Sequence, residues 1–336
     1  MTVNKATNEP IRQAPLGDIR RVLEAARCVL VGTHVDPDGD ALGTQLAFGA
    51  YLRQLGKRVV LLRDSDIPEK YGFLDGIDGI VLDAEQTQMP DVDTVLILEC
   101  PTPDRLGAVR CRIPDNARTV LIDHHRNTEL FADINWVDSS YSSVGEMTWE
   151  YLEAAGFTLT PEIAEHLYTA VLTDTGRFRY ESTTPRTMKC AGELIAAGAN
   201  PQKICDLVYY NMRPALMKLM GRVLNSVEYH HDDRICVLSL DHSMLAETGT
   251  DESDSEGLVD YTLFNRGVVA GALLKEVDDK HTRVSFRSNN HINVSEIAAR
   301  FGGGGHYNAS GCTLPWGMTK SKEEVIRFLI EANGVG

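Results

Sequence analysis

The sequence TVLIDHH, residues 119–125, joins a short strand-like run directly to an acid and two histidines. Residues 119–122 show no alternation of polar and apolar side chains, which is typical of a parallel strand covered on both faces. Asp123, His124 and His125 then follow the expected carboxyl end of that strand. Open α/β sheets place their functional sites at this edge. This stretch therefore predicts both the type of sheet and the place of a site.

A second cluster follows an earlier strand-like run, residues 27–33, and has the sequence HVDPDGD at residues 34–40. A tight turn through its proline and glycine would fold His34, Asp38 and Asp40 around one ion. This oxygen-rich set with a single histidine favours Mn²⁺ or Mg²⁺ over a thiolate zinc site. The alternative is an acidic turn in which an aspartate caps the next helix. Two such clusters at strand ends predict one shared metal centre.

Two further carboxylates stand at the ends of predicted elements. Glu99 ends the run Val95–Leu98, and Asp174 ends a helix predicted to begin at Pro161. At a strand end beside the first cluster, Glu99 would be placed to bridge two ions. Taken alone, it is better explained as an ordinary loop acid, and only the neighbouring clusters favour the metal role. The helix dipole disfavours an acid at a helix C-terminus, so a metal role explains Asp174 better than capping does.

The paired histidines suggest divided roles. Adjacent residues point in different directions, so one histidine can bind metal while the next meets the substrate. Asp123 then orients a histidine ring rather than binding metal itself. The alternative is a pair of histidines in a surface loop without any such role.

A glycine-rich segment in the C-terminal third suggests an anion site. Residues 302–306 read GGGGH, and residues 281–310 hold three arginines and one acid, opposite in sign to the whole chain. Glycines permit close backbone approach and expose N–H groups to an anion. Arg287, at the end of a predicted strand, would hold a phosphate through two parallel hydrogen bonds. A flexible glycine turn is the alternative.

The length of 336 residues predicts two domains. We expect an α/β fold: an N-terminal, mostly parallel sheet flanked by helices (1–198), a helical linker (199–228) and a smaller C-terminal α/β domain (229–336), with the active-site cleft between the domains. The main predicted strands are 27–33, 58–62, 94–98, 119–122, 234–240, 268–277 and 282–286, and the main predicted helices are 41–55, 145–155, 161–173, 184–197, 201–227 with a break near Pro214, and 294–300.

Charge and cysteine content limit the partners and the compartment. With 33 basic and 48 acidic residues, the net charge of −15 argues against binding to long nucleic acid in general. It leaves room for a small phosphorylated substrate at a metal centre. Seven irregularly spaced cysteines argue against a disulfide framework. The sequence shows neither an apolar leader nor a membrane-length apolar run, so we expect a cytoplasmic protein without a membrane partner.

Taken together, these residues resemble the DHH phosphoesterase superfamily, which includes RecJ-type exonucleases and family II inorganic pyrophosphatases. The segment 302–306 looks like the glycine-rich signature of the DHH-associated C-terminal domain. Length and motif set are most similar to the subfamily of bifunctional oligoribonucleases and pAp phosphatases (nanoRNases). The resemblance covers about residue 17 to Leu314. Its motif order matches the superfamily's four motifs at His34/Asp38/Asp40, Glu99, Asp123-His124-His125 and Asp174.

The resemblance implies a role for each matching residue. His34 and Asp38 would hold one Mn²⁺ and Asp40, His124 and Asp174 the second, with Glu99 as the bridging ligand; Mg²⁺ or Co²⁺ are the expected substitutes. His125, supported by Asp123, would contact the scissile phosphate. The substrate's terminal phosphate or base would be held by Arg287, Ser288, Gly303, Gly304, Gly305 and His306.

One departure concerns the bridging position, which usually carries Asp. The extra methylene of Glu99 would move the carboxylate and change metal spacing, preference or occupancy.

The activity implied is hydrolysis of short 5′-phosphorylated oligoribonucleotides, including linear dinucleotides, to mononucleotides, together with hydrolysis of pAp to AMP. Short RNA and pAp are the expected partners, long duplexes are not, and exposed apolar helices are compatible with a homodimer. Two alternatives stay open. One is a nucleotide sensor whose metal pair is altered by Glu99, and the other is a pyrophosphatase or a cyclic dinucleotide phosphodiesterase. The order of substrate preference and the polarity of cleavage stay open as well.

Overall fold

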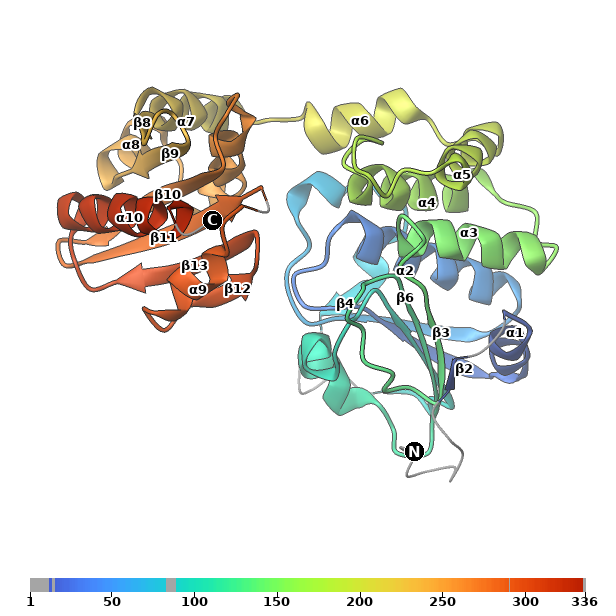
Figure 1. Ribbon diagram of the computed structural model, residues 1–336. Helices are drawn as coiled ribbons and strands as arrows, with labels where there is room; N and C mark the ends of the chain where they lie inside the picture. The colour runs from blue at the N-terminus through green and yellow to red at the C-terminus, as the bar shows by residue number, and fades with distance from the viewer. Residues whose placement is uncertain (1–11, 14–15, 83–88, 290, 335–336) are drawn as a thin grey trace. The chain divides into compact units, whose positions relative to one another are not determined.

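The computed structural model describes residues 12–13, 16–82, 89–289 and 291–334. The chain forms two compact units that divide between Asn211 and Met212 (Figure 1). The expected linker is helical, and its two helices fall in different units: α6 (Pro201–Tyr209) in the first and α7 (Pro214–Asn225) in the second. In the described part of the chain, no helix is both long and apolar enough to span a membrane.

The first unit is built on a seven-stranded sheet in the order β1-β7-β6-β5-β2-β3-β4, with every pair parallel. Strands β2 and β5 are buried along their whole length, which explains their unbroken apolar sequence. The expected parallel α/β sheet is confirmed. The strands are β1 (Arg12–Gln13), β2 (Cys28–Gly32), β3 (Arg58–Arg63), β4 (Ile80–Leu82), β5 (Thr94–Leu98), β6 (Arg118–Asp123) and β7 (Ile134–Val137).

The strand order reverses between β2 and β5. From β2 the chain moves outward through β3 and β4, and it then returns to the other side of β2 for β5, β6 and β7. The loops that leave β2 and β5 therefore run in opposite directions and open a space at the carboxyl ends of these strands. Such a switch point is the usual place for a site in an open α/β sheet.

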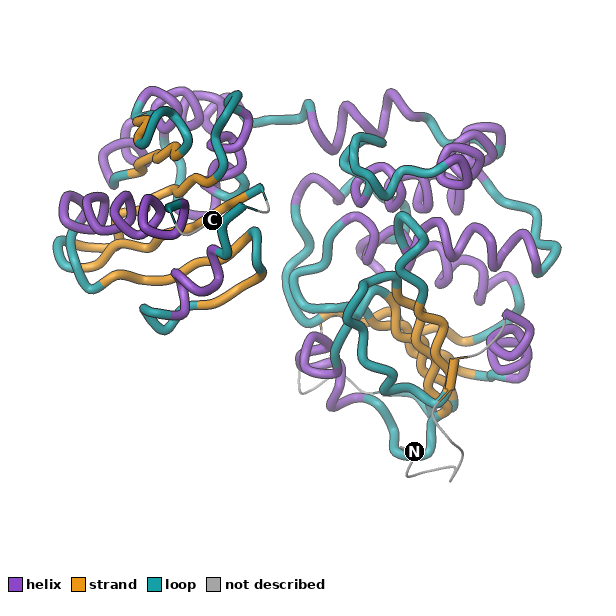
Figure 2. Tube along the Cα trace, viewed as in Figure 1, coloured by secondary structure: helices purple, strands orange, loops and turns teal. Residues whose placement is uncertain are grey.

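A layered group of helices covers this sheet (Figures 1 and 2). Helix α2 packs on strands β2 and β3, and α3 and α4 pack on α2. The helices of the unit are α1 (Leu16–Ala25), α2 (Gly39–Gln54), α3 (Val144–Ala154), α4 (Pro161–Asp174), α5 (Pro185–Ala196) and α6, with 3₁₀ segments η1 (Glu69–Tyr71), η2 (Ile77–Gly79) and η3 (Pro103–Arg112).

Two glycines one turn apart let α2 and α4 approach closely. A Cβ added at Gly39 would lie 2.4 Å from Thr173 Oγ1, and one added at Gly43 would lie 2.4 Å from the carbonyl oxygen of His166. No side chain fits in either place. As a result, the first turn of α2 lies against the last turn of α4, and α4 ends at Asp174.

The second unit has a six-stranded sheet in the order β12-β13-β11-β10-β9-β8. Only β9 and β10 pair in parallel; the other pairs are antiparallel. The elements are α7, β8 (Glu228–His230), β9 (Ile235–Leu240), α8 (His242–Thr248), η4 (Glu252–Ser255), η5 (Leu258–Phe264), β10 (Ala270–Asp278), β11 (His281–Ser288), α9 (Val294–Ala299), β12 (Gly304–His306), β13 (Ala309–Leu314) and α10 (Met318–Asn333).

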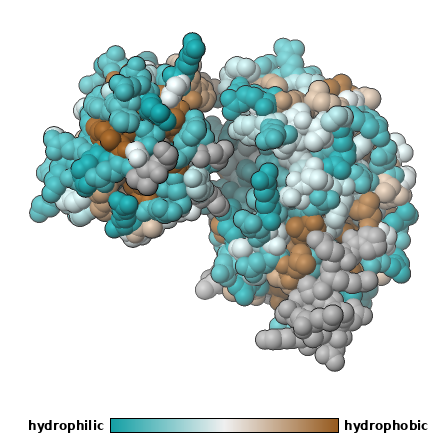
Figure 3. Space-filling view, viewed as in Figure 1, coloured by the Kyte–Doolittle hydropathy of each residue, from teal (hydrophilic) through white to brown (hydrophobic). Residues whose placement is uncertain are grey.

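Each face of the second sheet has its own apolar core. Helices α9 and α10 contribute Ile297 and Phe328 to one core, and α7 contributes Leu219 to the other. Hydrophilic residues predominate on the face of the molecule seen in Figure 3, in keeping with 24% charged residues. The expected smaller α/β unit in the C-terminal third is confirmed.

We expect Gly43→Ala to lower the free energy of unfolding by about 1–3 kcal/mol, because the methyl group overpacks the contact with α4. Gly192→Ala is the matched control. Gly192 is an exposed helical glycine in α5, and a Cβ there would have nothing within 4 Å. The control should gain about 0.5–1 kcal/mol. Urea unfolding measures both, and equal effects of the two substitutions would contradict the packing argument.

Candidate metal centre

Seven of the predicted site residues meet at the carboxyl edge of the first sheet. They form three overlapping groups in which the ligand atoms all lie within 4.8 Å of one another. Two residues, Glu99 and His124, each belong to two groups, so the groups make one continuous cluster. The groups are His34/Asp38/Glu99, Glu99/His124/His125 and Asp40/His124/Asp174.

The first group contains a close contact between a buried ring nitrogen and a buried carboxylate oxygen. His34 Nε2 lies 2.7 Å from Glu99 Oε2. His34 Nδ1 lies 2.7 Å from the carbonyl oxygen of Val35, and when it donates its proton there, Nε2 presents a lone pair to the carboxylate. Such a pair needs a proton or a cation between its atoms. This arrangement fits a metal ion.

Glu99 has a backbone conformation that few residues with a side chain adopt. Its φ is +55°, in the left-handed region. Outside glycine this conformation carries strain, which is commonly found at functional sites. The Glu99 amide donates to Ile122 on β6 at 3.0 Å and fixes the residue at the strand end. Burial raises the pKa of Glu99, but hydrogen bonds from His124 and His34 outweigh it and hold the pKa at about 2.

The carboxylates of Asp38 and Asp40 are held by backbone amides. Asp38 Oδ1 caps helix α2 and accepts from the amides of Asp40 and Ala41, each at 3.0 Å. The helix-capping explanation is therefore correct for Oδ1, and the same residue keeps Oδ2 for a further ligand. Asp40 is fully buried; its oxygens accept from the amides of Val144, at 2.7 Å, and Gly145, at 2.8 Å.

His124 faces the carboxylate at the end of α4. Its Nε2 lies 3.3 Å from Asp174 Oδ2 and 3.5 Å from Glu99 Oε1. On the other side of the ring, Nδ1 lies 3.3 Å from the carbonyl oxygen of Tyr141. A histidine held by a carbonyl in this way presents its second nitrogen to a metal.

Asp123 and His125 have different surroundings. Asp123 is fully buried, and its Oδ1 accepts from the His124 amide at 2.9 Å and lies 2.8 Å from His125 Nδ1. The hydroxyl of Thr128 donates to Oδ2. With both oxygens occupied, Asp123 orients the histidines. The side chain of His125 is 43% exposed, and its Nε2 is the nitrogen that can meet a ligand.

The cluster holds more negative charge than the protein around it neutralises. Burial and the charge of Glu99 raise the pKa of Asp38, which is the more exposed of the two aspartates. Burial and the charges of Asp174 and Glu99 raise the pKa of Asp40 well above its usual range. Burial raises the pKa of Asp174 to about 7. Burial lowers the pKa of His124, but Glu99, Asp40 and Asp174 together raise it to about 10. Divalent cations would relieve this repulsion.

Comparisons with known proteins agree with this arrangement. Residues 28–171 match the model of the DHH family, N-terminal domain, and residues 232–333 match the DHHA1 domain. The chain is 31% identical to the bifunctional oligoribonuclease and PAP phosphatase NrnA of Thermus thermophilus over 291 residues, which cover 85% of this chain and 84% of that protein. The chain belongs to the DHH family of phosphoesterases.

Two further proteins are similar to this chain over most of their length. The protein of the same name from Bacillus subtilis is 30% identical over 301 residues, covering 88% of this chain and 92% of that one. The crystal structure of an exopolyphosphatase-related protein from Bacteroides fragilis superposes with a TM-score of 0.88 at 26% identity, covering 95% of this chain and 96% of that chain. Both the fold and the family are therefore shared along nearly the whole chain.

In the DHHA1 domain, two predicted substrate residues already have protein partners. Arg287, whose side chain is 30% exposed, donates from Nε to Asp260 at 2.7 Å. Ser288 is buried, and its hydroxyl donates to the carbonyl oxygen of Ile292 at 2.6 Å. The guanidinium of Arg287 is thus partly exposed, whereas the hydroxyl of Ser288 is committed to the local backbone.

The glycine run of the DHHA1 domain is more ordered than a flexible turn. Gly304 to His306 form β12, which pairs with β13. A Cβ at Gly303 would lie 2.1 Å from the Gly311 carbonyl oxygen, and one at Gly305 would lie 2.5 Å from that of Ala309. These two glycines are thus required by the hairpin itself. Gly304 has open space around it, and the side chain of His306 lies outside the described residues.

Three contacts of the DHH site have no clear signal in the sequence. Arg105 Nη2 lies 3.0 Å from His34 Nδ1. The Tyr141 carbonyl and the first amides of α3 contact His124 and Asp40, as described above. Ser143 followed by Glu146 is a helix-start pattern that could have located those amides. No local pattern indicates which carbonyl a histidine will reach.

We expect the metal-free protein to be less stable at pH 8.5 than at pH 6. The pKa of Asp174 is about 7 in the folded protein against 3.8 ordinarily, and that of His124 is about 10 against 6.5. Both groups bind their protons more tightly in the folded state than in the unfolded state. Their contribution to the free energy of unfolding is therefore fully present below the pKa of the unfolded state, and it is lost as pH rises through the pKa of the folded state.

Thermal unfolding in a chelator should therefore give a lower Tm at pH 8.5, and saturating Mn²⁺ should raise Tm more at pH 8.5 than at pH 6. Asp174→Asn is the control and should reduce the difference in Tm between the two pH values. If the Tm of the metal-free wild-type protein depended on pH in the same way as that of Asp174→Asn, the raised pKa of Asp174 would be contradicted.

Proposed function

We propose that this protein hydrolyses short 5′-phosphorylated oligoribonucleotides, including linear dinucleotides, to mononucleotides, and pAp to AMP, at a centre of two Mn²⁺ ions. One observation carries the proposal: the two oxygens of the Glu99 carboxylate lie between His34 on one side and His124 on the other. Each histidine has further carboxylates beside it. A single shared carboxylate between two sets of ligands is the arrangement that a pair of cations requires.

The proposed ligands lie at the ends of five elements: β2, α2, β5, β6 and α4. His34 and Asp38 would hold one ion, and Asp40, His124 and Asp174 the other, with Glu99 between them. The donors are mainly carboxylate oxygens, which suits Mn²⁺ and permits Mg²⁺ or Co²⁺. Two such ions lower the pKa of a water molecule and stabilise charge on phosphoryl oxygens.

The chain's own residues supply orientation and a proton donor. Asp123 holds Nδ1 of His125 at 2.8 Å and leaves Nε2 for the phosphoryl group. Burial lowers the pKa of His125, but the hydrogen bond that its Nδ1 donates to Asp123 and the charge of Glu99 raise the pKa above its ordinary value. A protonated His125 can donate to a phosphoryl oxygen as charge develops there, which stabilises the transition state.

The choice of substrate class rests on the relatives and on charge. The relatives from Thermus thermophilus and Bacillus subtilis are both named bifunctional oligoribonuclease and PAP phosphatase. The net charge of −15 disfavours long nucleic acid and leaves short, phosphate-ended substrates. Arg287 and the amides around Gly304 are proposed to bind the terminal phosphate.

Asp38→Asn and His124→Ala should each reduce hydrolysis to below about one hundredth of the wild-type rate, since even groups that only orient metal ligands cost 10–100-fold when removed. The assay is Mn²⁺-dependent release of mononucleotides from 5′-phosphorylated RNA of two to five residues. His231→Ala is the matched control, because His231 is exposed in the turn between β8 and β9. Turnover retained in both variants would refute the ligand assignment.

Arg287→Ala should raise KM about tenfold or more and change kcat much less, because a hydrogen bond to a charged group contributes about 1.5–3 kcal/mol. Arg327→Ala is the control. Arg327 also pairs with carboxylates, Glu324 and Glu331, but lies on the outer surface of α10. Steady-state kinetics with pAp and with a dinucleotide measure both, and an unchanged KM would argue against the phosphate contact.

A nucleotide sensor is the second candidate, and Glu99 is the observation that favours it. Its carboxylate stands where the family usually carries Asp, within 3.5 Å of three histidines. A sensor would bind pAp or a dinucleotide tightly without turnover, and Glu99→Asp would then create turnover.

A substrate panel separates the enzyme, the sensor and the other phosphoesterase activities. It contains pAp, linear and cyclic dinucleotides, short RNA and pyrophosphate, each tested with Mn²⁺, Mg²⁺ and Co²⁺. Products are resolved by length, and binding is measured under chelation. Turnover confined to pyrophosphate or to the cyclic dinucleotide would contradict the proposal.

A further inference from the structure

Arg186, on helix α5, contacts two residues just before α3 and one in its first turn. Its guanidinium carbon lies 3.6 Å above the centre of the Tyr141 ring. Nε donates to Glu146 Oε1 at 3.0 Å, and Nη2 donates to the carbonyl oxygen of Ser140 at 2.9 Å. One side chain thus combines an ion pair, a backbone hydrogen bond and an aromatic contact.

The partner carboxylate extends this arrangement into the first turn of α3. Glu146 is fully buried, and its Oε2 accepts from the Ser142 amide at 2.7 Å. The hydroxyl of Ser143 caps the helix by accepting from the Glu146 amide at 3.0 Å. Residues 138–146 are therefore held as one unit, which we call the α3 start.

The α3 start contacts two proposed metal ligands directly. The Tyr141 carbonyl faces Nδ1 of His124, and the amides of Val144 and Gly145 hold the two oxygens of Asp40. These contacts determine which nitrogen of His124 carries the lone pair and how the Asp40 carboxylate is turned. His34 and Asp38 have no such contact with the α3 start among the described residues.

We propose that Arg186 is a positioning residue for the ion held by Asp40, His124 and Asp174. It touches neither the ion nor the substrate, and it acts by fixing the α3 start behind two of the ligands. This inference rests on the two-ion centre proposed above. Arg suits the role because its planar fork can donate in two directions while it stacks on a ring, which an ammonium group cannot do.

A purely structural role is the competing explanation, because a buried ion pair also contributes to folding. Removing Arg186 alone would leave the charge of Glu146 buried without a cationic partner, which is strongly destabilising. Two variants avoid this problem. Arg186→Lys keeps the charge but loses the fork, and Arg186→Met with Glu146→Gln removes both charges together.

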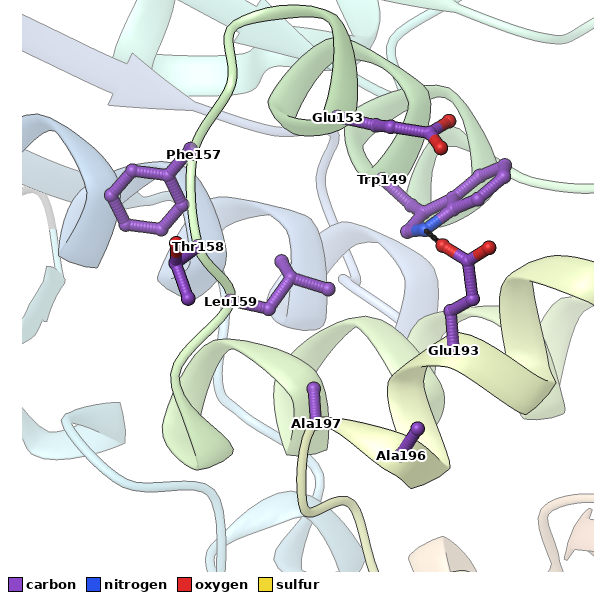
Figure 4. Close-up of a pocket in the computed structure, with 8 residues that line it drawn as sticks. All are labelled: Trp149, Glu153, Phe157, Thr158, Leu159, Glu193, Ala196 and Ala197. Carbon is purple, nitrogen blue, oxygen red and sulfur yellow. Dashed lines mark hydrogen bonds between the residues drawn. The ribbon is translucent and has the colours of Figure 1, made fainter.

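Lys189 provides a matched control on the same helix. Its ammonium group lies 5.1 Å from the centre of the Trp149 ring and within 3.5 and 3.6 Å of Glu153 and Glu193. Like Arg186, it joins α5 to α3 through an aromatic ring and a carboxylate, those of Trp149 and Glu153, whereas Glu193 lies on α5 itself. Figure 4 shows the groove that Trp149, Glu153 and Glu193 line, in which Trp149 Nε1 donates a hydrogen bond to Glu193. None of the proposed metal ligands lines this groove. Lys189→Met should therefore leave metal binding unchanged.

The test is calorimetric titration of Mn²⁺ into chelator-treated full-length protein, with circular dichroism to confirm folding. Wild type should bind two ions. Both Arg186 variants should keep one site within about threefold and weaken the other about 10–100-fold, the usual effect of losing a group that orients a ligand. Lys189→Met should match wild type at both sites.

Two results would overturn the inference: Arg186 variants that bind both ions like Lys189→Met, or equal weakening of both sites, which is the effect of general destabilisation. If the charge-free variant fails to fold, Arg186→Lys alone decides between these outcomes. Fewer than two ions bound by wild type would instead refute the two-ion centre, so failure of the inference and failure of the proposed function can be told apart.

Discussion

Repulsion among buried carboxylates is the constraint on which the rest of the site depends. Asp40 and Glu99 are almost completely buried, and Asp174 is largely so. Ligand atoms of Asp40 and Asp174 lie within 4.8 Å of each other, and Glu99 and Asp174 both face Nε2 of His124. Bringing such charges together costs stability unless donors or cations offset it. The protein supplies two kinds of donor, histidines for Glu99 and helix-start amides for Asp40. The remaining negative charge is what divalent cations would neutralise, so the cost in stability and the function have one origin.

The fold meets this constraint through close backbone contacts. Reversal of the strand order between β2 and β5 leaves room at the carboxyl edge. Gly39, Gly43 and Gly145 then allow α2, α3 and α4 to converge so closely that the ends of these helices reach that edge. Side chains at these glycines would push the helices apart and separate Asp40 from Asp174. The close packing of these helices therefore also sets the geometry of the site.

Predictions from local sequence patterns were most accurate for elements with a clear run or repeat of apolar residues. The buried strands β2, β3, β5 and β6 and the helix opening at Thr160-Pro161 were found within one or two residues. Short or polar elements such as β7 and α10 were not identified. The glycine run was interpreted as an anion-binding loop, whereas Gly303 and Gly305 are required by the β12–β13 hairpin. A glycine that meets a ligand and one that meets its own backbone look the same in sequence.

The sequence by itself determined the family, the parallel sheet, and which acids and histidines follow which strands, because residue type and strand periodicity are local properties. Only the tertiary structure decided what stands behind those residues. No local pattern indicates that the Tyr141 carbonyl reaches His124 or that the Arg186 guanidinium reaches the Ser140 carbonyl. The helix-start pattern at Ser143 could locate the amides of Val144 and Gly145, but it does not indicate that they meet Asp40. Which of them reaches a given side chain depends on how helices far apart in the chain pack, and that is a property of the whole fold.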